Sequence, residues 1–181
     1  MLSNEQLRRI EKIFADRMRM QPLFVRNPSI QQPAAASQIF ELRRTSPVHY
    51  YLVPQVAGAP VPPANGTFVY VVPADDPGRI YCGAQPGSEA GIDPRFAVQG
   101  HTSLSGRADV LYAGEIQLVH GELLSWNNSS GHYSPPAALR EPNLIPALAR
   151  LLPPERFADV ASLSTILRRQ RLQARRYVNV D

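Results

Sequence analysis

The chain of 181 residues has a single cysteine and a single lysine, and it contains no long apolar run. Cys82 alone excludes an internal disulfide and any metal site built only from cysteines. No apolar stretch approaches the roughly 20 residues that cross a bilayer, so we expect no membrane partner. The opening MLSNEQLRRIEKIF is amphipathic and charged, without the apolar segment of a signal peptide. We therefore expect a cytoplasmic protein or one secreted by a leaderless route.

The positive charge is almost entirely arginine, with 18 arginines against Lys12 and a formal net charge of +4. Together with many alanines and prolines, this bias is typical of a bacterial chain encoded by GC-rich DNA. Five arginines gather in RRQRLQARR, from Arg168 to Arg176. Such a run is either a solvated helix face or a contact for phosphate, nucleic acid or an acidic partner. Only Tyr177 offers an aromatic ring nearby, so nucleic acid is the weaker alternative.

Residue patterns at the N-terminus predict a helix followed by a linker. Residues 3–20 have apolar side chains at helical spacing, and Ser3 begins a capping box. NPSIQQPAAASQ, residues 27–38, is rich in proline, alanine and glutamine, as linkers are. The chain is therefore expected to divide into a helix with its linker, residues 1–38, and a main domain, residues 39–181.

The middle of the chain has strand patterns. HYYLVPQV at 49–56 and TFVYVVPA at 67–74 are aromatic and β-branched, RIYCGA follows the turn DDPG, and RFAVQGHTSLS is grouped with these strands. His120 and Gly121 lie between two apolar runs and predict a tight hairpin with Gly121 at positive φ. Leucines at helical spacing follow Pro136. The order predicts an α+β fold with a mostly antiparallel β-sheet and helices at both ends.

A cluster of polar side chains lies between residues 101 and 133. Imidazoles titrate near neutral pH, and a carboxylate can be tuned towards that range, so such a cluster can carry acid–base chemistry. No HExxH element or close histidine pair is present, and no metal is expected. A Ser-His-Asp triad is disfavoured because the Gly-x-Ser-x-Gly element is missing. The members of the cluster are His101, Thr102, Ser103, Glu115, His120, Ser129, Ser130, His132 and Tyr133.

Residues 100–136, GHTSLSGRADVLYAGEIQLVHGELLSWNNSSGHYSPP, resemble the signature block of plant calmodulin-binding proteins that carry an IQ motif, and of related uncharacterised bacterial effector- or toxin-like proteins. The similarity extends weakly over residues 47–160. Thr102 replaces a serine of that block, and Glu115 replaces a basic residue found in many plant members. No IQ-type segment is present, so calmodulin binding is not implied. The matching elements are His101-Thr102-Ser103, Gly106, Ala113-Gly114-Glu115, Gly121 and Ser130-Gly131-His132-Tyr133 with Pro135.

The leading hypothesis is a secreted bacterial effector or toxin domain that acts on a nucleotide-like substrate, by ADP-ribosyl transfer or NAD cleavage. NAD is then the co-substrate. The expected partners are a host or competitor target protein and an immunity protein or chaperone, and the route is type III- or type VI-like secretion. The catalytic candidates are His101, Ser103, Glu115, His132 and Tyr133, and the substrate-binding candidates are His49, Tyr51, Thr102, Ser130 and Gly131.

Two other functions stay open. A non-catalytic protein-binding module would use the same groove without turnover. A metal-independent ribonuclease would use His101 and His132, with the arginine run on RNA. Every catalytic interpretation requires His101, Glu115 and the His132-Tyr133 pair to meet in one solvent-accessible hollow; if they are buried with ordinary hydrogen-bond partners, a scaffold or docking role is favoured.

Overall fold

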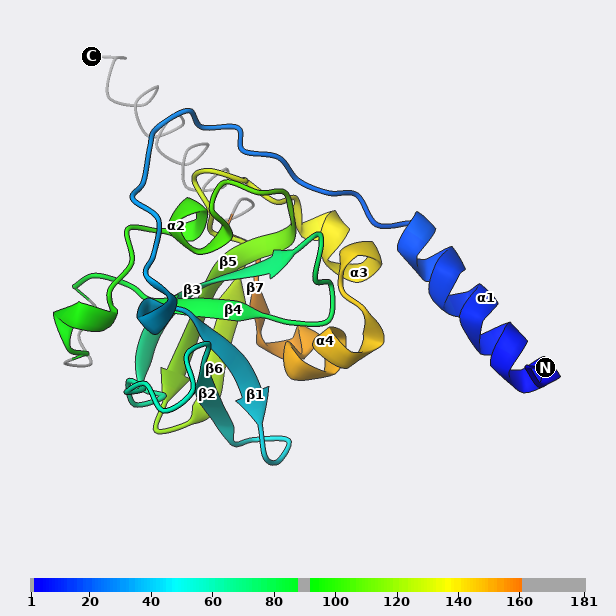
Figure 1. The fold of residues 1–181 in the computed structure, drawn as a ribbon, viewed down its shortest axis with the longest axis horizontal. Coiled ribbons are helices and arrows are strands. Elements are labelled where there is room, and N and C mark those ends of the chain that lie inside the picture. The colour runs from blue at the N-terminus through cyan, green and yellow to red at the C-terminus, as the bar shows by residue number, and fades with distance from the viewer. Residues whose placement is uncertain (1, 88–91, 161–181) are drawn as a thin grey trace, which may run out of the picture.

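A computed structural model describes residues 2–87 and 92–160 of the protein (Figure 1). Within these residues, seven strands form one sheet in the order β2-β1-β4-β3-β5-β6-β7. Neighbouring strands are antiparallel except β6 and β7, so the expected α+β class with a mostly antiparallel sheet is confirmed. The strands are β1 (Phe40–Arg44), β2 (Tyr50–Pro54), β3 (Gly66–Pro73), β4 (Tyr81–Ala84), β5 (Val110–Val119), β6 (Glu122–Asn127) and β7 (Phe157–Ala158).

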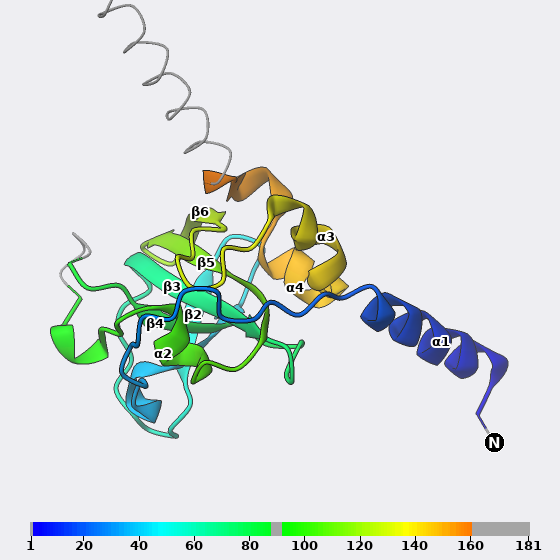
Figure 2. The same ribbon diagram turned by 90° about the horizontal axis from the view of Figure 1, so that it is seen from above.

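The helices are distributed over both faces of the sheet. Helix α2 packs on one face, whereas α3 and α4 cover the other, as the view from above shows (Figure 2). The predicted final helix and the run from Arg168 to Arg176 lie outside the described residues. The helices are α1 (Asn4–Met18), α2 (His101–Ser105), α3 (Arg140–Asn143) and α4 (Pro146–Leu151), with 3-10 turns at Ala36–Gln38, Pro94–Phe96, Ala137–Leu139 and Pro154–Arg156.

Strands β3 and β5 form the centre of the sheet and carry both layers of the core. The run FVYVV, residues 68–72, is apolar throughout because both of its faces are buried, a pattern usual for central strands. Phe68, Tyr70 and Val72 belong to the larger apolar cluster with Trp126 and the leucines of the α3–α4 region. Val69 and Val71 belong to a second cluster below α2. Helix α2 is thereby held against the middle of the sheet.

The β5–β6 hairpin turns at His120 and Gly121, as the sequence predicts. Both residues have positive φ, 49° and 83°, which matches the right-handed twist of paired strands. A Cβ on Gly121 would lie 2.7 Å from the imidazole of His49 and 3.2 Å from the Tyr50 carbonyl oxygen, and together with the positive φ this favours glycine. The Tyr50 N–H donates to the Gly121 carbonyl at 2.6 Å. Strand β2 therefore meets the hairpin tip, and the sheet is strongly curled.

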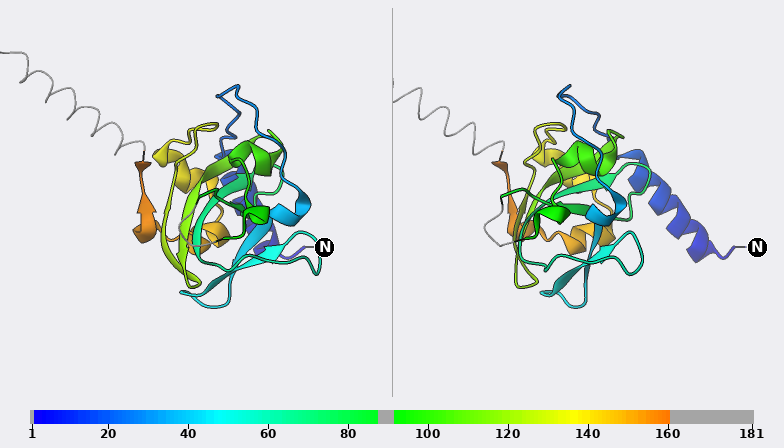
Figure 3. Two further views of the ribbon diagram at one scale, coloured as in Figure 1. Left: turned by 90° about the vertical axis from the view of Figure 1, so that its left-hand side faces the viewer. Right: turned by 60° about the vertical axis from the view of Figure 1, so that its left-hand side comes forward.

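Helix α1 begins at the predicted capping box and has no buried residue. It projects away from the sheet in Figures 1 and 2. The segment after it behaves differently, because Leu23 pairs with Val110 through two backbone hydrogen bonds. The buried amide of Asn143 also accepts from the Gln21 N–H and donates to the Gln21 carbonyl, both at 2.8 Å. Residues 21–38 are therefore attached to the main domain, beside α2 in Figure 3.

Among the described residues, no helix is both long and apolar enough to cross a membrane.

Candidate functional site

Helix α2 positions the first three residues of the predicted cluster. These residues were expected in a strand, but they form a short helix that is flanked by Gly100 and Gly106. Gly106 has the left-handed conformation that commonly ends helices. A glycine on β4 lets this helix approach closely: a Cβ on Gly83 would lie 2.9 Å from the side chain of Leu104 on α2. As a result His101, Thr102 and Ser103 are all buried.

The imidazole of His101 is used by the fold. Its Nε2 lies 2.8 Å from the carbonyl oxygen of Gly114, and because a carbonyl only accepts, Nε2 carries the proton and donates. The pKa of His101 is lowered to about 4, mainly by burial; the bond to Gly114 opposes this shift, and nearby His132 adds to it. At neutral pH this side chain is therefore an uncharged donor to the backbone of β5.

Ser103 differs from its neighbours because its hydroxyl has no hydrogen-bond partner among the described residues, although it is buried. Its backbone is fully engaged: the N–H donates to the Gly100 carbonyl at 3.2 Å, and the carbonyl accepts from the Ala34 N–H at 3.0 Å. Burying an unbonded hydroxyl costs about 1–3 kcal/mol. Ser103 therefore lowers the stability of the fold rather than contributing to it.

The stretch from Ser130 to Ser134 forms a compact turn that buries His132 and Tyr133. The Ser130 carbonyl accepts from the Ser134 N–H at 2.8 Å, and the Ser130 hydroxyl accepts from the Tyr133 N–H at 3.3 Å. The Tyr133 ring is fully buried, and its hydroxyl donates to the Ala108 carbonyl at 2.6 Å. Burial raises the pKa of Tyr133, so the phenol stays protonated. Gly131 is exposed at the outer side of the turn.

An extended segment covers this cluster. We call residues 27–35 the strap; they belong to the predicted linker, residues 27–38. The Gln31 side chain accepts from the Thr102 hydroxyl at 2.6 Å and from the Thr102 N–H at 3.1 Å, and it donates to the Gln99 carbonyl at 2.9 Å. Ser29 meets His132 with its hydroxyl 2.9 Å from Nε2. The strap therefore uses the polar groups that a substrate would contact.

Glu115 lies at the edge of the cluster. It follows Ala113 on β5 by two residues, which places its side chain on the same sheet face as α2. Its N–H donates to Asn127 Oδ1 at 3.0 Å, and Asn127 Nδ2 donates to its carboxylate at 3.2 Å. The carboxylate is partly exposed. Asn127, on β6, is therefore the partner of Glu115, and sequence reasoning did not identify it.

Gly114 explains the small-residue pair before Glu115. A Cβ at this position would lie only 1.9 Å from the Asn127 carbonyl oxygen, so the strands approach too closely for any side chain. The Tyr70 hydroxyl donates to the same carbonyl at 3.0 Å. The glycine serves the approach of β6 to β5.

The predicted substrate-binding residues His49 and Tyr51 lie away from this cluster. His49 is exposed beside Gly121 at the hairpin tip, towards the far end of β5 from α2. Tyr51 is opposite Arg43 in the β1–β2 ladder. The structure thus brings together His101, Thr102, Ser103, Ser130, His132 and Tyr133 beneath the strap, with Glu115 at their edge.

Two hollows among the described residues are formed by other side chains. One of about 370 Å³ lies between the end of α1 and the α3–α4 region, where it is lined by Asp16, Met20 and Ile145 among others. Another, of about 330 Å³, contains four arginines and Tyr51. No group of three or more metal-binding side chains occurs within residues 2–87 and 92–160.

No protein-family model, curated protein or solved structure matches the chain significantly. The similarity of residues 100–136 to the plant and bacterial signature block therefore stays a prediction.

Proposed function

We propose that the protein is a non-catalytic binding module whose helix α1 docks on a partner protein. The observation that carries the proposal is the apolar face of α1. Its large side chains are between 43% and 73% exposed, and none is covered by the main domain. These side chains are Leu7, Ile10, Ile13, Phe14 and Met18.

The energetics of a short helix support this role. A helix of 15 residues is marginal in water, because most helical stability comes from packing an apolar face. Burying five such side chains would contribute roughly 1.5–3 kcal/mol each. That gain is comparable to the estimated 4–15 kcal/mol cost of association, so a reversible complex is expected.

The charges on α1 indicate the kind of partner. The helix and its C-cap carry five cations against three carboxylates, so its flanks are net positive. The best complement is an apolar groove with an acidic rim. The target protein, immunity protein and chaperone suggested by the sequence are candidates for this partner. The cations are Arg8, Arg9, Lys12, Arg17 and Arg19, and the carboxylates are Glu5, Glu11 and Asp16.

Two matched double variants test the proposal in the native host. Ile10→Ser with Phe14→Ser removes part of the apolar face, whereas Arg9→Ser with Lys12→Ser changes the polar side of the same helix. We expect a stoichiometric partner to co-purify with the wild type, to be lost in the apolar variant, and to bind the polar variant within about tenfold of the wild type. A partner retained by the apolar variant, or no stoichiometric partner at all, would overturn the docking role.

The nucleotide hypothesis is a second candidate, and the partly exposed carboxylate of Glu115 is the observation that favours it. Labelled NAD with cell lysate tests it, using Glu115→Gln and the exposed β6 control Glu122→Gln. Label transfer or nicotinamide release that only Glu115→Gln removes would support the enzyme. The ribonuclease alternative has less support, because His101 is buried and uncharged at neutral pH. RNA that stays intact on incubation would exclude it.

A further inference from the structure

A cation-rich pocket lies where strand β1 separates from strand β4. We call it the arginine pocket: its volume is about 330 Å³, and it is bounded by β1, the turn before β4, and α4. Its polar lining contains one carboxylate, Glu41, and the phenol of Tyr51. The arginines that line it are Arg43, Arg44, Arg79 and Arg150.

The pocket forms because the pairing of β1 with β4 stops before β1 ends. Strand β1 pairs with β2 along its whole length, but with β4 only at Phe40 and Glu41. A last backbone bond joins the Leu42 N–H to the Ile80 carbonyl at 3.0 Å. Beyond it, Arg43 and Arg44 border a gap that is closed by residues of α4. Because backbone donors alternate along a strand, the Arg44 N–H faces the same side as that of Leu42.

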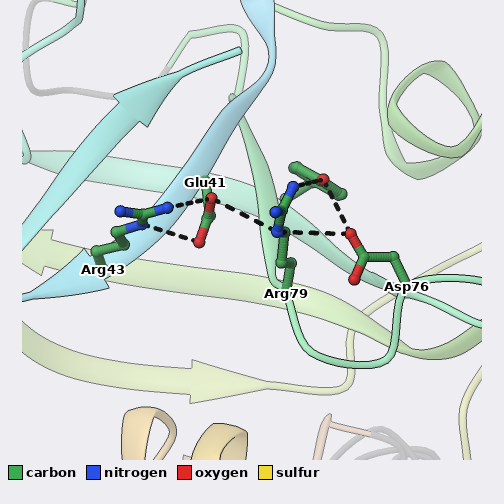
Figure 4. Close-up of polar contacts among 5 residues, drawn as sticks. Glu41, Arg43, Asp76 and Arg79 are labelled. Atoms are coloured by element: carbon green, nitrogen blue, oxygen red, sulfur yellow. Dashed lines mark hydrogen bonds and ion pairs between the residues drawn. The ribbon is translucent and has the colours of Figure 1, made fainter.

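Two of the arginines are held in place by a chain of ion pairs (Figure 4). Arg43 donates to both oxygens of Glu41, at 2.9 and 3.0 Å. Arg79 Nε lies 3.9 Å from the same carboxylate and 3.6 Å from Asp76. Glu41 therefore bridges two guanidinium groups and fixes their orientation. An arginine that is pre-oriented loses less conformational entropy when it binds a ligand.

The other two arginines have no such partner. Among the described residues, no carboxylate lies within 4.0 Å of Arg44 or Arg150. The residues that line the pocket thus include four arginines and a single acidic residue. Cations gathered in a concave surface repel one another and focus a positive potential, which an anion relieves.

We propose that the arginine pocket binds the phosphate group of a small organic phosphate. Guanidinium forks match the spacing of phosphate oxygens, and a phosphate dianion offsets the unpaired charge of Arg44 and Arg150. The pocket volume is at the lower end of small-molecule sites. Tyr51, opposite Arg43 in the ladder, offers a ring against which the organic part packs. This site is separate from α1, so it adds a ligand to the proposed docking role.

Calorimetric titration of the full chain tests the proposal with pyrophosphate, ADP and adenosine as probes. The pocket variant is Arg44→Gln with Arg150→Gln, which breaks no ion pair within the described residues. The control is Arg8→Gln with Arg9→Gln on α1, which removes the same charge. We expect ADP and pyrophosphate to bind the wild type and the control alike. Losing two charge-assisted hydrogen bonds should weaken binding to the pocket variant about a hundredfold.

The other outcomes show which residues, and which part of the ligand, account for the binding. Equal affinities for ADP and pyrophosphate would support recognition of phosphate alone, and tighter ADP binding that Tyr51→Leu weakens would add the ring contact. Unchanged binding to the pocket variant would assign the anion to other arginines and overturn the proposal. Equal weakening in the control, binding of adenosine as tight as that of ADP, or no saturation at millimolar concentration would also overturn it. A thermal melt of each variant shows whether the fold is retained.

Discussion

The Nε2 atom of His101 lies 2.8 Å from the carbonyl oxygen of Gly114, and this bond ties α2 to the central strand β5. It gives the imidazole of His101 a structural role. The same is true of Tyr133, whose hydroxyl donates to Ala108. Each side chain donates a hydrogen bond to a backbone carbonyl, and such a bond contributes about 0.5–1.5 kcal/mol.

Stability should fall as the pH is lowered, because of His101. The folded imidazole has a pKa of about 4, against 6.5 for the ordinary side chain, since burial disfavours its charged form. Below pH 6.5 the unfolded chain therefore binds the proton first, and about 3 kcal/mol is lost by pH 4. Denaturant unfolding at pH 7 and pH 4 measures this loss.

The variant His101→Gln isolates the contribution of that one imidazole. Its amide still donates to Gly114 but does not titrate, so its stability should depend less on pH than that of the wild type. The exposed His120→Gln serves as the control and should follow the wild type. Parallel pH profiles for wild type and His101→Gln would contradict the assignment.

Ser103→Ala should stabilise the protein by about 1 kcal/mol, because it removes a buried hydroxyl that has no partner within the described residues. Ser105→Ala, two residues later on α2, should act in the opposite direction. The Ser105 hydroxyl lies 2.6 Å from the Tyr133 hydroxyl and also accepts from the Arg107 N–H. Chemical denaturation of both variants gives the comparison. If Ser103 were a catalytic serine, Ser103→Ala would abolish activity and would not stabilise the protein.

Much of the sheet could be predicted from local patterns. The run TFVYVV predicts β3, and His120-Gly121 predicts a tight hairpin, because backbone geometry at a turn depends on the residues in it. Helix α2 was missed, since five residues are too few for a helical period to be visible.

The surroundings of the site could not be predicted in the same way. Gln31 and Thr102 are 71 positions apart in the chain, and their bond leaves no periodic pattern in either segment. Asn127 and Glu115 are paired by the register of β5 and β6, which a bulge shifts. The arginine pocket combines residues from β1, the turn before β4, and α4. Only the folded structure brings these residues together. The composition therefore indicates the net charge of the protein but not where the arginines gather.

Gly114→Ala should disrupt the centre of the sheet. The added methyl group would lie 1.9 Å from the Asn127 carbonyl oxygen, a backbone atom that cannot move without separating β5 from β6. We expect a loss of several kcal/mol, as for other overpacked core positions, or a failure to fold. Gly131→Ala is the matched control, because its Cβ would have no neighbour within 4 Å. Soluble yield and melting temperature measure both, and a Gly114 variant as stable as the Gly131 variant would refute the close approach.

Gln31→Ala should loosen the strap while leaving the sheet intact. The substitution removes the acceptor of the Thr102 hydroxyl and N–H and the donor to the Gln99 carbonyl, so up to three hydrogen bonds are lost. Hydrogen exchange should therefore accelerate at residues 29–34, where the Ala34 N–H is bonded to Ser103, and not in β3 or β5. Ile30→Ala is the control, since that side chain is 82% exposed and removing it should leave exchange unchanged. Equal exchange in Gln31→Ala and Ile30→Ala would contradict this prediction. It would mean that the other contacts of the strap, such as that of Ser29 with His132, are sufficient to hold it.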